Sequence, residues 1–323
     1  LNGYDVKFWM RSNVLVDELN DLHENTQYLP GYKLSHRVIA TESMVEAVAD
    51  ASVVFVAVPS TSFREVVQQV ITHAPSKSML ISTTKGIEAG SFKLMSQIMA
   101  EESSSAKIGV LSGPNLAKEI ASKHPTGTVI ASNFEEVRET VQEILSSDTF
   151  KVYTNDDMFG VELGGSLKNI YAIIAGLAEA IGMGHNTNSM LVTRGLTEMA
   201  RFGRELGADP MTFLGLAGVG DLVVTCSTPL SRNYRIGQIL GTGKSIEEAV
   251  GEVGQVAEGV NTVKLVKEKN ITTITVTHDM ESVYEFADST AFIKDGNIVW
   301  YGDAKEIKKT KHYELRNFIN GRI

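Results

Sequence analysis

The chain has 323 residues, of which 43% are hydrophobic and 21% charged, as in an ordinary folded protein with room for two cores. Its net charge of −9 and its lack of a basic block argue against a nucleic-acid surface. The sequence contains no apolar run of about 18 residues, so no membrane span is predicted. The single cysteine, Cys226, excludes an intrachain disulfide and fits a reducing cytoplasm, where we expect a small buried thiol.

The first half of the sequence alternates short apolar strands with helices. Strands are expected at Tyr4–Trp9, Val53–Val58, Met79–Ser82, Lys107–Leu111 and Thr128–Ala131. Helices are expected at 14–24, 43–49, 62–72, 91–102 and 134–146. This alternation predicts an α/β domain with a parallel sheet that helices cover on both faces.

From about residue 155 the pattern becomes wholly helical. Helices are expected at 156–182, 188–206, 231–240, 245–250 and 258–269. We therefore predict a nucleotide-binding α/β domain at residues 1–154 and an all-helical domain at residues 155–270. The functional site is expected in the cleft between them.

A lysine interrupts the apolar face of the expected helix at 156–182. The apolar residues of that face recur every three or four positions, at Leu163, Leu167, Ile170, Ile174, Leu177 and Ile181. Burial would lower the pKa of Lys168 from ~10.4 toward neutrality, which suits a general base acting on an alcohol. Taken alone, Lys168 is better explained as a lysine at the helix edge whose stem reaches water.

A second polar stretch downstream changes that balance. Asp221 follows Gly218-Val219-Gly220 and can accept a hydrogen bond from a lysine or from a substrate hydroxyl. Ser231, Arg232 and Asn233 open the helix expected at 231–240, where free N–H groups and an arginine fork suit an anion. As a lone tripeptide they would be an ordinary N-cap. Together with Lys168, they indicate chemistry on a small phosphorylated alcohol.

Six stretches carry a resemblance to a known family. They are Ser82–Gly86, Ser112–Glu119, Gly164–Asn169, Gly218–Asp221, Ser231–Asn233 and Ala257–Val260. Their order and spacing make residues 1 to about 270 similar to bacterial NAD(P)-dependent glycerol-3-phosphate dehydrogenase. The resemblance implies a Rossmann-like domain followed by an all-helical domain. It also implies reduction of dihydroxyacetone phosphate by NAD(P)H to sn-glycerol 3-phosphate for phospholipid synthesis, and it is compatible with a homodimer.

The resemblance also implies roles for individual residues. Lys168 is expected to accept the proton of the substrate's secondary hydroxyl. Substrate binding is implied for Lys85, Gly113, Asn115, Lys168, Asp221, Ser231, Arg232 and Asn233. Cofactor contacts are implied for Arg11, Tyr28, Lys85, Ala117, Arg232, Val256 and Glu258, and no metal is expected. Many relatives carry Ser or Thr where this chain has Asn115, and simple packing explains Tyr28 and Val256 equally well.

The dinucleotide signature is not found in the sequence. A Rossmann domain opens with a strand and a glycine-rich turn whose amides contact the pyrophosphate. Here Tyr4–Trp9 corresponds to the family's second strand, and the chain begins with Leu1 rather than Met, so we expect the first strand to be missing and cofactor affinity to be poor. Arg11 can pair with a 2′-phosphate, so NADP is expected as well as NAD. A solvated surface arginine explains Arg11 equally well.

Residues 271–323 depart from the family pattern. A β-branched strand is expected at Ile271–Thr277, which could fill the place of the missing strand, followed by a helical stretch and a hairpin around Asp295-Gly296. These residues resemble the C-terminal end of an ABC-transporter ATPase, in which His278 would match the histidine that senses the γ-phosphate. No G-x-x-x-x-G-K-S/T loop precedes it, so we interpret His278 as vestigial and the junction near residue 270 as a fusion.

Two other functions compete with the dehydrogenase. A non-catalytic remnant or fusion product would keep the substrate clamp and bind the cofactor poorly, and the missing glycine-rich turn favours this alternative. An ABC-type nucleotide-binding module is favoured only by the tail. Lys168, Asp221 and Arg232 favour the dehydrogenase over that module.

Overall fold

The structure is a computed structural model that describes residues 2–103, 106–268, 280, 283–284, 287, 289–294 and 297–319. The chain divides into two compact units, Leu1–Lys269 and Asn270–Ile323. The predicted strand at Ile271–Thr277, together with His278 and the Asp295-Gly296 turn, lies outside the described residues.

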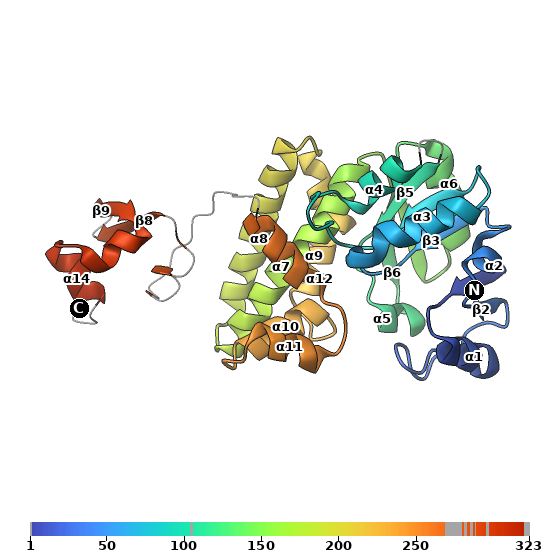
Figure 1. Cartoon of the computed structure of the whole chain (residues 1–323), viewed down its shortest axis with the longest axis horizontal. Coiled ribbons are helices and arrows are strands. Elements are labelled where there is room, and N and C mark those ends of the chain that lie inside the picture. Colours follow the sequence, from blue (N-terminus) through green and yellow to red (C-terminus); the bar gives the residue numbers. More distant parts are fainter. Residues whose placement is uncertain are drawn as a thin grey trace. The chain divides into compact units, whose positions relative to one another are not determined.

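A five-stranded sheet forms the centre of the first unit (Figure 1). Its strands, in spatial order, are β3 (Val53–Val56), β4 (Met79–Ser82), β5 (Lys107–Ser112), β6 (Thr126–Ala131) and β7 (Phe150–Asn155). Neighbouring strands are parallel except β5 and β6, which are antiparallel. The sheet is thus mixed rather than wholly parallel, because the chain leaves β5 and enters β6 at the same end of the two strands.

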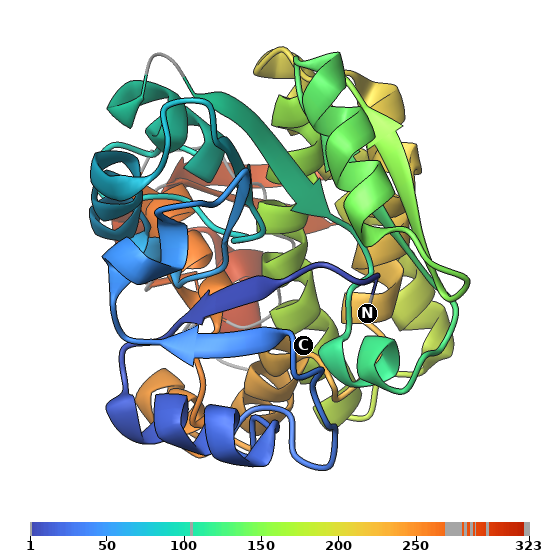
Figure 2. The ribbon, with the colours of Figure 1, turned by 90° about the vertical axis from the view of Figure 1, so that its right-hand side faces the viewer.

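The first two strands form a separate parallel pair, shown as the two blue arrows in Figure 2. They are β1 (Val6–Trp9) and β2 (Val38–Thr41), and no ladder joins β1 to β3 among the described residues. The observed order β2-β1 and β3-β4-β5 matches the doubly wound order 3-2-1-4-5-6, except that no described strand occupies the position between β1 and β3. Among the described residues the position between β1 and β3 is therefore unfilled, and it is called the open position below.

Helices cover both faces of the five-stranded sheet. Helices α3 (Phe63–His73) and α4 (Met95–Glu102) share a buried cluster with Leu80, whereas α6 (Glu135–Leu145) shares one with Ile81. Neighbouring residues of β4 therefore point to opposite faces. The other helices of this half are α1 (Asn13–Leu22), α2 (Met44–Val48) and α5 (Ala117–Ala121).

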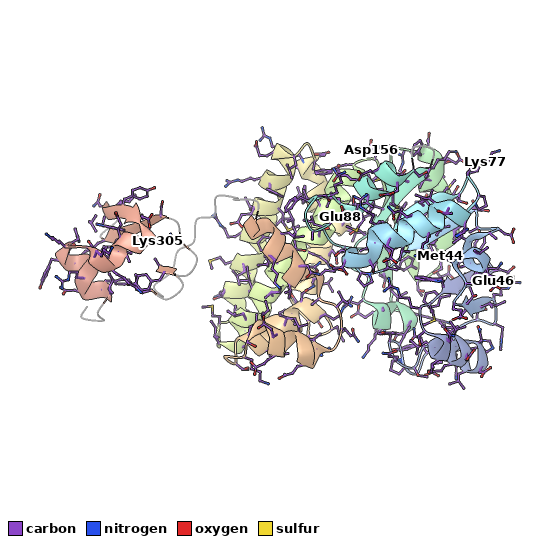
Figure 3. The ribbon with its side chains drawn as sticks, viewed as in Figure 1. Met44, Glu46, Lys77, Glu88, Asp156 and Lys305 are labelled. Carbon is purple, nitrogen blue, oxygen red and sulfur yellow. The ribbon has the colours of Figure 1, made fainter. Side chains whose placement is uncertain are left out.

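The loop between β4 and α4 is tied to α3 by an ion pair. Arg64 of α3 donates to the two carboxylate oxygens of Glu88, at 2.7 and 2.8 Å, and Glu88 is labelled in Figure 3. A bidentate pair of this kind fixes both position and orientation. It restrains the loop that carries Lys85.

Helix α7 (Met158–Ala180) is the axis of the helical half. Its N-cap is Asp157, which accepts a hydrogen bond from the Gly160 amide. The other elements of this half are α8 (His185–Glu205), a 3₁₀ turn (Pro210–Leu214), a π-helical turn (Leu216–Gly220), α9 (Asp221–Thr225), α10 (Arg232–Leu240), α11 (Ile246–Val253) and α12 (Glu258–Glu268). The domain boundary predicted at residues 154 and 155 stays a prediction, since it lies inside the first unit between β7 and α7.

The second unit has a small core of its own. Strands β8 (Ser289–Lys294) and β9 (Asn297–Asp303) pair antiparallel, which confirms the predicted hairpin. A 3₁₀ helix (Ala304–Lys309) and α14 (Tyr313–Ile319) follow, and Ile307 and Leu315 are buried. Across the described part of the chain, no helix combines the length and the apolar character that crossing a membrane requires.

Candidate active site

Lys168 is buried on α7 rather than exposed at the helix edge. Its Nζ donates to Asp221 Oδ1 and to Thr225 Oγ1, each at 2.5 Å. A buried ammonium is tolerated only when it is paired and hydrogen-bonded, and these two acceptors supply both. Two of its three donor positions are therefore occupied by protein.

Lys85 reaches the same carboxylate from the sheet domain. Its Nζ donates to Asp221 Oδ2 at 2.6 Å and to the carbonyl oxygen of Gly113 at 3.0 Å. Asp221 is only 1% exposed, so one buried carboxylate bridges two lysines from different halves of the unit. Lys168, Lys85, Asp221 and Thr225 are called the lysine cluster below.

The local chain explains why these groups meet. Asp221 begins α9 directly after the π-helical turn, and Thr225 lies four residues later on the same helix face. Gly165, one turn before Lys168, packs where a Cβ would be 2.6 Å from Ser112 Oγ, so α7 approaches the end of β5 closely. Thr225 was assigned no role from the sequence, although its spacing of four residues from Asp221 could have indicated one.

Burial and charge lower the pKa of Lys168 to about 8. Desolvation is the largest cause, and repulsion by the Lys85 ammonium adds to it, whereas Asp221 opposes both. A lysine in this range can exchange a proton with a substrate near neutral pH.

The predicted anion clamp separates into two kinds of side chain. Ser231 caps α10, since its Oγ accepts from the Tyr234 amide at 3.3 Å. Asn233 donates to Asn169 Oδ1 at 2.9 Å and accepts from the Gly259 amide at 3.0 Å. The Arg232 side chain is exposed and has no hydrogen bond or ion pair within the described residues. Of the three side chains, Arg232 is the one free to meet an anion, and the substrate role of the clamp stays a prediction.

The end of β5 presents unsatisfied polar atoms beside Lys85. Asn115 Nδ2 donates to Thr128 Oγ1 at 2.9 Å, and the Gly113 carbonyl accepts from Lys85. Asn115 Oδ1 and Ser112 Oγ are buried without a partner in the part of the chain that the structure describes. Buried polar atoms of this kind normally find a ligand or water, so this region suits a hydroxylated substrate.

The predicted cofactor residues lie on several elements. Arg11 precedes α1, Tyr28 is in the loop after it, Ala117 begins α5 and Val256 precedes α12; all four are exposed. Glu258 begins α12, and its two carboxylate oxygens accept hydrogen bonds from Ser60. The structure thus places only Lys85 of this set in the lysine cluster, and the cofactor contacts stay predictions.

The described residues fit a dinucleotide in part. Lys85 lies in the loop that follows β4, beyond the carboxyl end of that strand, where such ligands bind. The pyrophosphate requires a glycine-rich turn after the central strand, and no described residue occupies that strand position. The described residues therefore fit only the part of the cofactor that would lie beside Lys85. Within the described residues, no group of three or more His, Cys, Asp or Glu side chains is arranged to hold a metal.

Family comparison covers both halves of the first unit. The model for the NAD-dependent glycerol-3-phosphate dehydrogenase N-terminus matches residues 1–138, and the model for its C-terminus matches residues 157–289. The chain belongs to this dehydrogenase family. Membership confirms the predicted Rossmann-like domain followed by a helical domain. It also confirms the predicted NAD(P)-dependent oxidoreductase.

Individual dehydrogenases show how far the similarity extends. The glycerol-3-phosphate dehydrogenase (NAD(P)+) of Saccharophagus degradans is 54% identical over 268 residues, which cover 83% of this chain and 75% of that protein. The enzyme of the same name from Ectopseudomonas mendocina is 55% identical over 266 residues, covering 82% and 78%. The crystal structure of the Coxiella burnetii glycerol-3-phosphate dehydrogenase has a TM-score of 0.80 and 36% identity, covering 83% of this chain and 84% of that one.

The tail compares differently. The dehydrogenase C-terminus model extends to residue 289, beyond the junction predicted near residue 270. The comparisons do not support the predicted resemblance of residues 272–323 to an ABC-transporter ATPase.

Proposed function

We propose that this chain reduces dihydroxyacetone phosphate to sn-glycerol 3-phosphate with NADH or NADPH, in the direction that supplies phospholipid synthesis. The names of its relatives and its family membership support the reaction. The observation that carries the proposal is the sharing of the Asp221 carboxylate by Lys168 and Lys85.

Lys168 is the proton donor of the proposed reaction. The bound cofactor supplies the hydride, and the chain must supply a proton to the carbonyl oxygen. Asp221 and Thr225 hold Lys168 Nζ and leave one of its three donor positions for the substrate oxygen. In the reverse direction the neutral amine accepts the hydroxyl proton.

The charge of the lysine cluster suits a phosphorylated substrate. Two ammonium groups and one carboxylate give a net positive charge, which attracts an anion. Lys85 also keeps one donor position beyond Asp221 and Gly113, and the Arg232 fork is exposed. We therefore assign Lys85 and Arg232 to the phosphate.

The test is turnover of dihydroxyacetone phosphate by the purified chain, followed by the loss of reduced cofactor and the appearance of sn-glycerol 3-phosphate. Lys168→Ala should lower kcat by roughly 10²–10⁴-fold, the contribution of a positioned proton donor. Lys264→Ala, on the exposed side of α12, is the matched control and should retain kcat. Near-normal turnover in Lys168→Ala would remove this lysine from the mechanism.

One observation favours a second function. The open position between β1 and β3 supports a chain that binds glycerol 3-phosphate but turns it over poorly. Calorimetric binding of glycerol 3-phosphate without turnover would favour this alternative. A cytoplasmic location and a homodimer belong to the proposal only through the family resemblance.

A further inference from the structure

Ser60 and Glu258 join the sheet domain to the helical half of the first unit. Ser60 opens the short 3₁₀ turn Ser60–Ser62 that precedes α3, and Glu258 is the first residue of α12. Glu258 Oε1 accepts from the Ser60 amide at 2.9 Å, and Oε2 accepts from Ser60 Oγ at 2.6 Å. Ser60 is buried, so this is a shielded, two-point contact between segments 198 residues apart.

The contact fixes the loop that carries Lys85. A Cβ on Gly86 would lie 2.7 Å from the Ser60 Cβ and 3.0 Å from Glu258 Oε2, so only glycine allows this approach. On its other side, the Gly86 carbonyl accepts from Ser166 Oγ of α7 at 3.2 Å. The backbone next to Lys85 is therefore held between Ser60 and α7.

The same turn of α12 also holds the segment that carries Lys168. The Gly259 amide donates to Asn233 Oδ1, and Asn233 Nδ2 donates to Asn169 Oδ1, on the residue after Lys168. A Cβ on Gly259 would lie 2.7 Å from Asn233 Oδ1 and 2.8 Å from the Asn169 carbonyl. The first two residues of α12 thus contact the surroundings of both lysines.

We propose that Ser60 is a positioning residue of the dehydrogenase, acting through Glu258. Together with Gly86 and Gly259 these residues form the α12 latch, which holds the Lys85 loop and the Lys168 helix at the separation that lets both lysines share Asp221. Two ammonium groups repel one another, so their approach to one carboxylate needs a rigid frame. The latch also engages both carboxylate oxygens of Glu258 in protein contacts. The inference rests on the proposed function.

The first test compares two serine variants of the same turn. Ser60→Ala removes the hydroxyl that binds Glu258, whereas Ser62→Ala removes one whose only described bond, at 3.4 Å, goes to the nearby Pro59 carbonyl. Ser60→Ala should lower kcat about tenfold or more, since small misplacements of reacting groups are costly. Ser62→Ala should retain kcat. Equal kcat in the two variants would overturn the proposal.

A pH profile separates positioning from a general loss of folded protein. If Lys85 moves away, its repulsion of Lys168 weakens, and the pKa of Lys168 should rise toward its ordinary value. Among the described residues, Asp221 and Cys226 are the other titratable groups that interact with Lys168. The alkaline fall of kcat should thus move to higher pH in Ser60→Ala and stay unchanged in Ser62→Ala. A lower kcat with an unmoved profile would reduce Ser60 to a merely structural role.

A double-mutant cycle tests the latch without requiring turnover. The denaturation midpoints of Ser60→Ala, Glu258→Ala and the double variant should be non-additive, with the double variant no worse than the poorer single one. Additive losses would contradict the contact itself. A chain without turnover but with a non-additive cycle would refute the proposed function and retain the contact, so the two failures are distinguishable.

Discussion

The lysine cluster and the strands beside the open position, β1 and β3, differ in how completely their side chains are paired or buried. At the cluster, each buried charge has a partner, because Asp221 serves Lys168 and Lys85 together. At the open position between β1 and β3, the side chains of Val6, Phe8 and Phe55 are 46, 40 and 36% exposed. The groups of the lysine cluster come from α7, α9 and the loop after β4, whereas the open position lies between two strands. The two regions should therefore respond separately to perturbation.

The largest effect is expected from neutralising the shared carboxylate. Asp221→Asn leaves two ammonium groups facing a neutral amide, and breaking a buried pair costs about 3–5 kcal/mol. The variant should lose most turnover and unfold at much lower denaturant, whereas Asp148→Asn, at an exposed site, should do neither. Denaturant unfolding measures the difference. An Asp221→Asn protein as stable as the control would show that the cluster does not need its charge.

A smaller effect is expected from Glu162, a buried acid on α7, the helix that carries Lys168. Its carboxylate accepts from the Ser96 amide and hydroxyl at the start of α4, and burial raises its pKa to about 7. The native state therefore holds this proton more tightly than the unfolded state. Stability should fall as pH rises from ~4.5 to ~7, by on the order of 3 kcal/mol.

Glu162→Gln removes this titration while keeping a carbonyl oxygen near Ser96. Its stability should lack that decrease, so the two stability curves should converge at low pH and separate above neutrality. Urea unfolding at several pH values measures both. Parallel curves for the wild type and the variant would rule out Glu162 as the cause.

The smallest predicted effect concerns the open position. A polypeptide of these 323 residues should bind NADPH roughly 10- to 150-fold more weakly than the Coxiella burnetii enzyme, since one charge-assisted contact to the pyrophosphate is worth about 1.5–3 kcal/mol. Its affinity for glycerol 3-phosphate should match that enzyme. Fluorescence titration of NADPH and calorimetry of glycerol 3-phosphate give both values. Equal NADPH affinity would erase the proposed contrast between the two regions.

Sequence reasoning located the long helices but missed two strands. The predicted helix at 156–182 matches α7 closely, because its apolar pattern continues over many turns and Asp157 is a typical N-cap residue. Strands β2 and β7 were not predicted. Strand β7 mixes polar with apolar residues, β2 has only four residues, and pairing with a neighbouring strand decides the conformation of both. The antiparallel pairing of β5 and β6 likewise depends on where a loop returns, which local sequence does not encode.

The site was predictable where motifs placed its residues. Asp221 was predicted to accept a hydrogen bond from a lysine or from a substrate hydroxyl, and it forms an ion pair with Lys168 at 2.5 Å. Thr225 was not predicted, although it lies four residues after Asp221 on the same helix. The contact of Ser60 with Glu258 did not follow, because no local pattern links residues 198 positions apart.

The most direct test of the central claim is the pH dependence of kcat for dihydroxyacetone phosphate reduction in the wild type and in Lys85→Ala. If Lys168 donates the proton, kcat should fall as pH rises through about 8, and glycerol 3-phosphate oxidation should rise through the same pKa. Removing the Lys85 charge should move both transitions to higher pH, because its repulsion lowers the pKa of Lys168. A kcat that is independent of pH in this range, in both directions, would contradict the assignment of Lys168 as the proton donor.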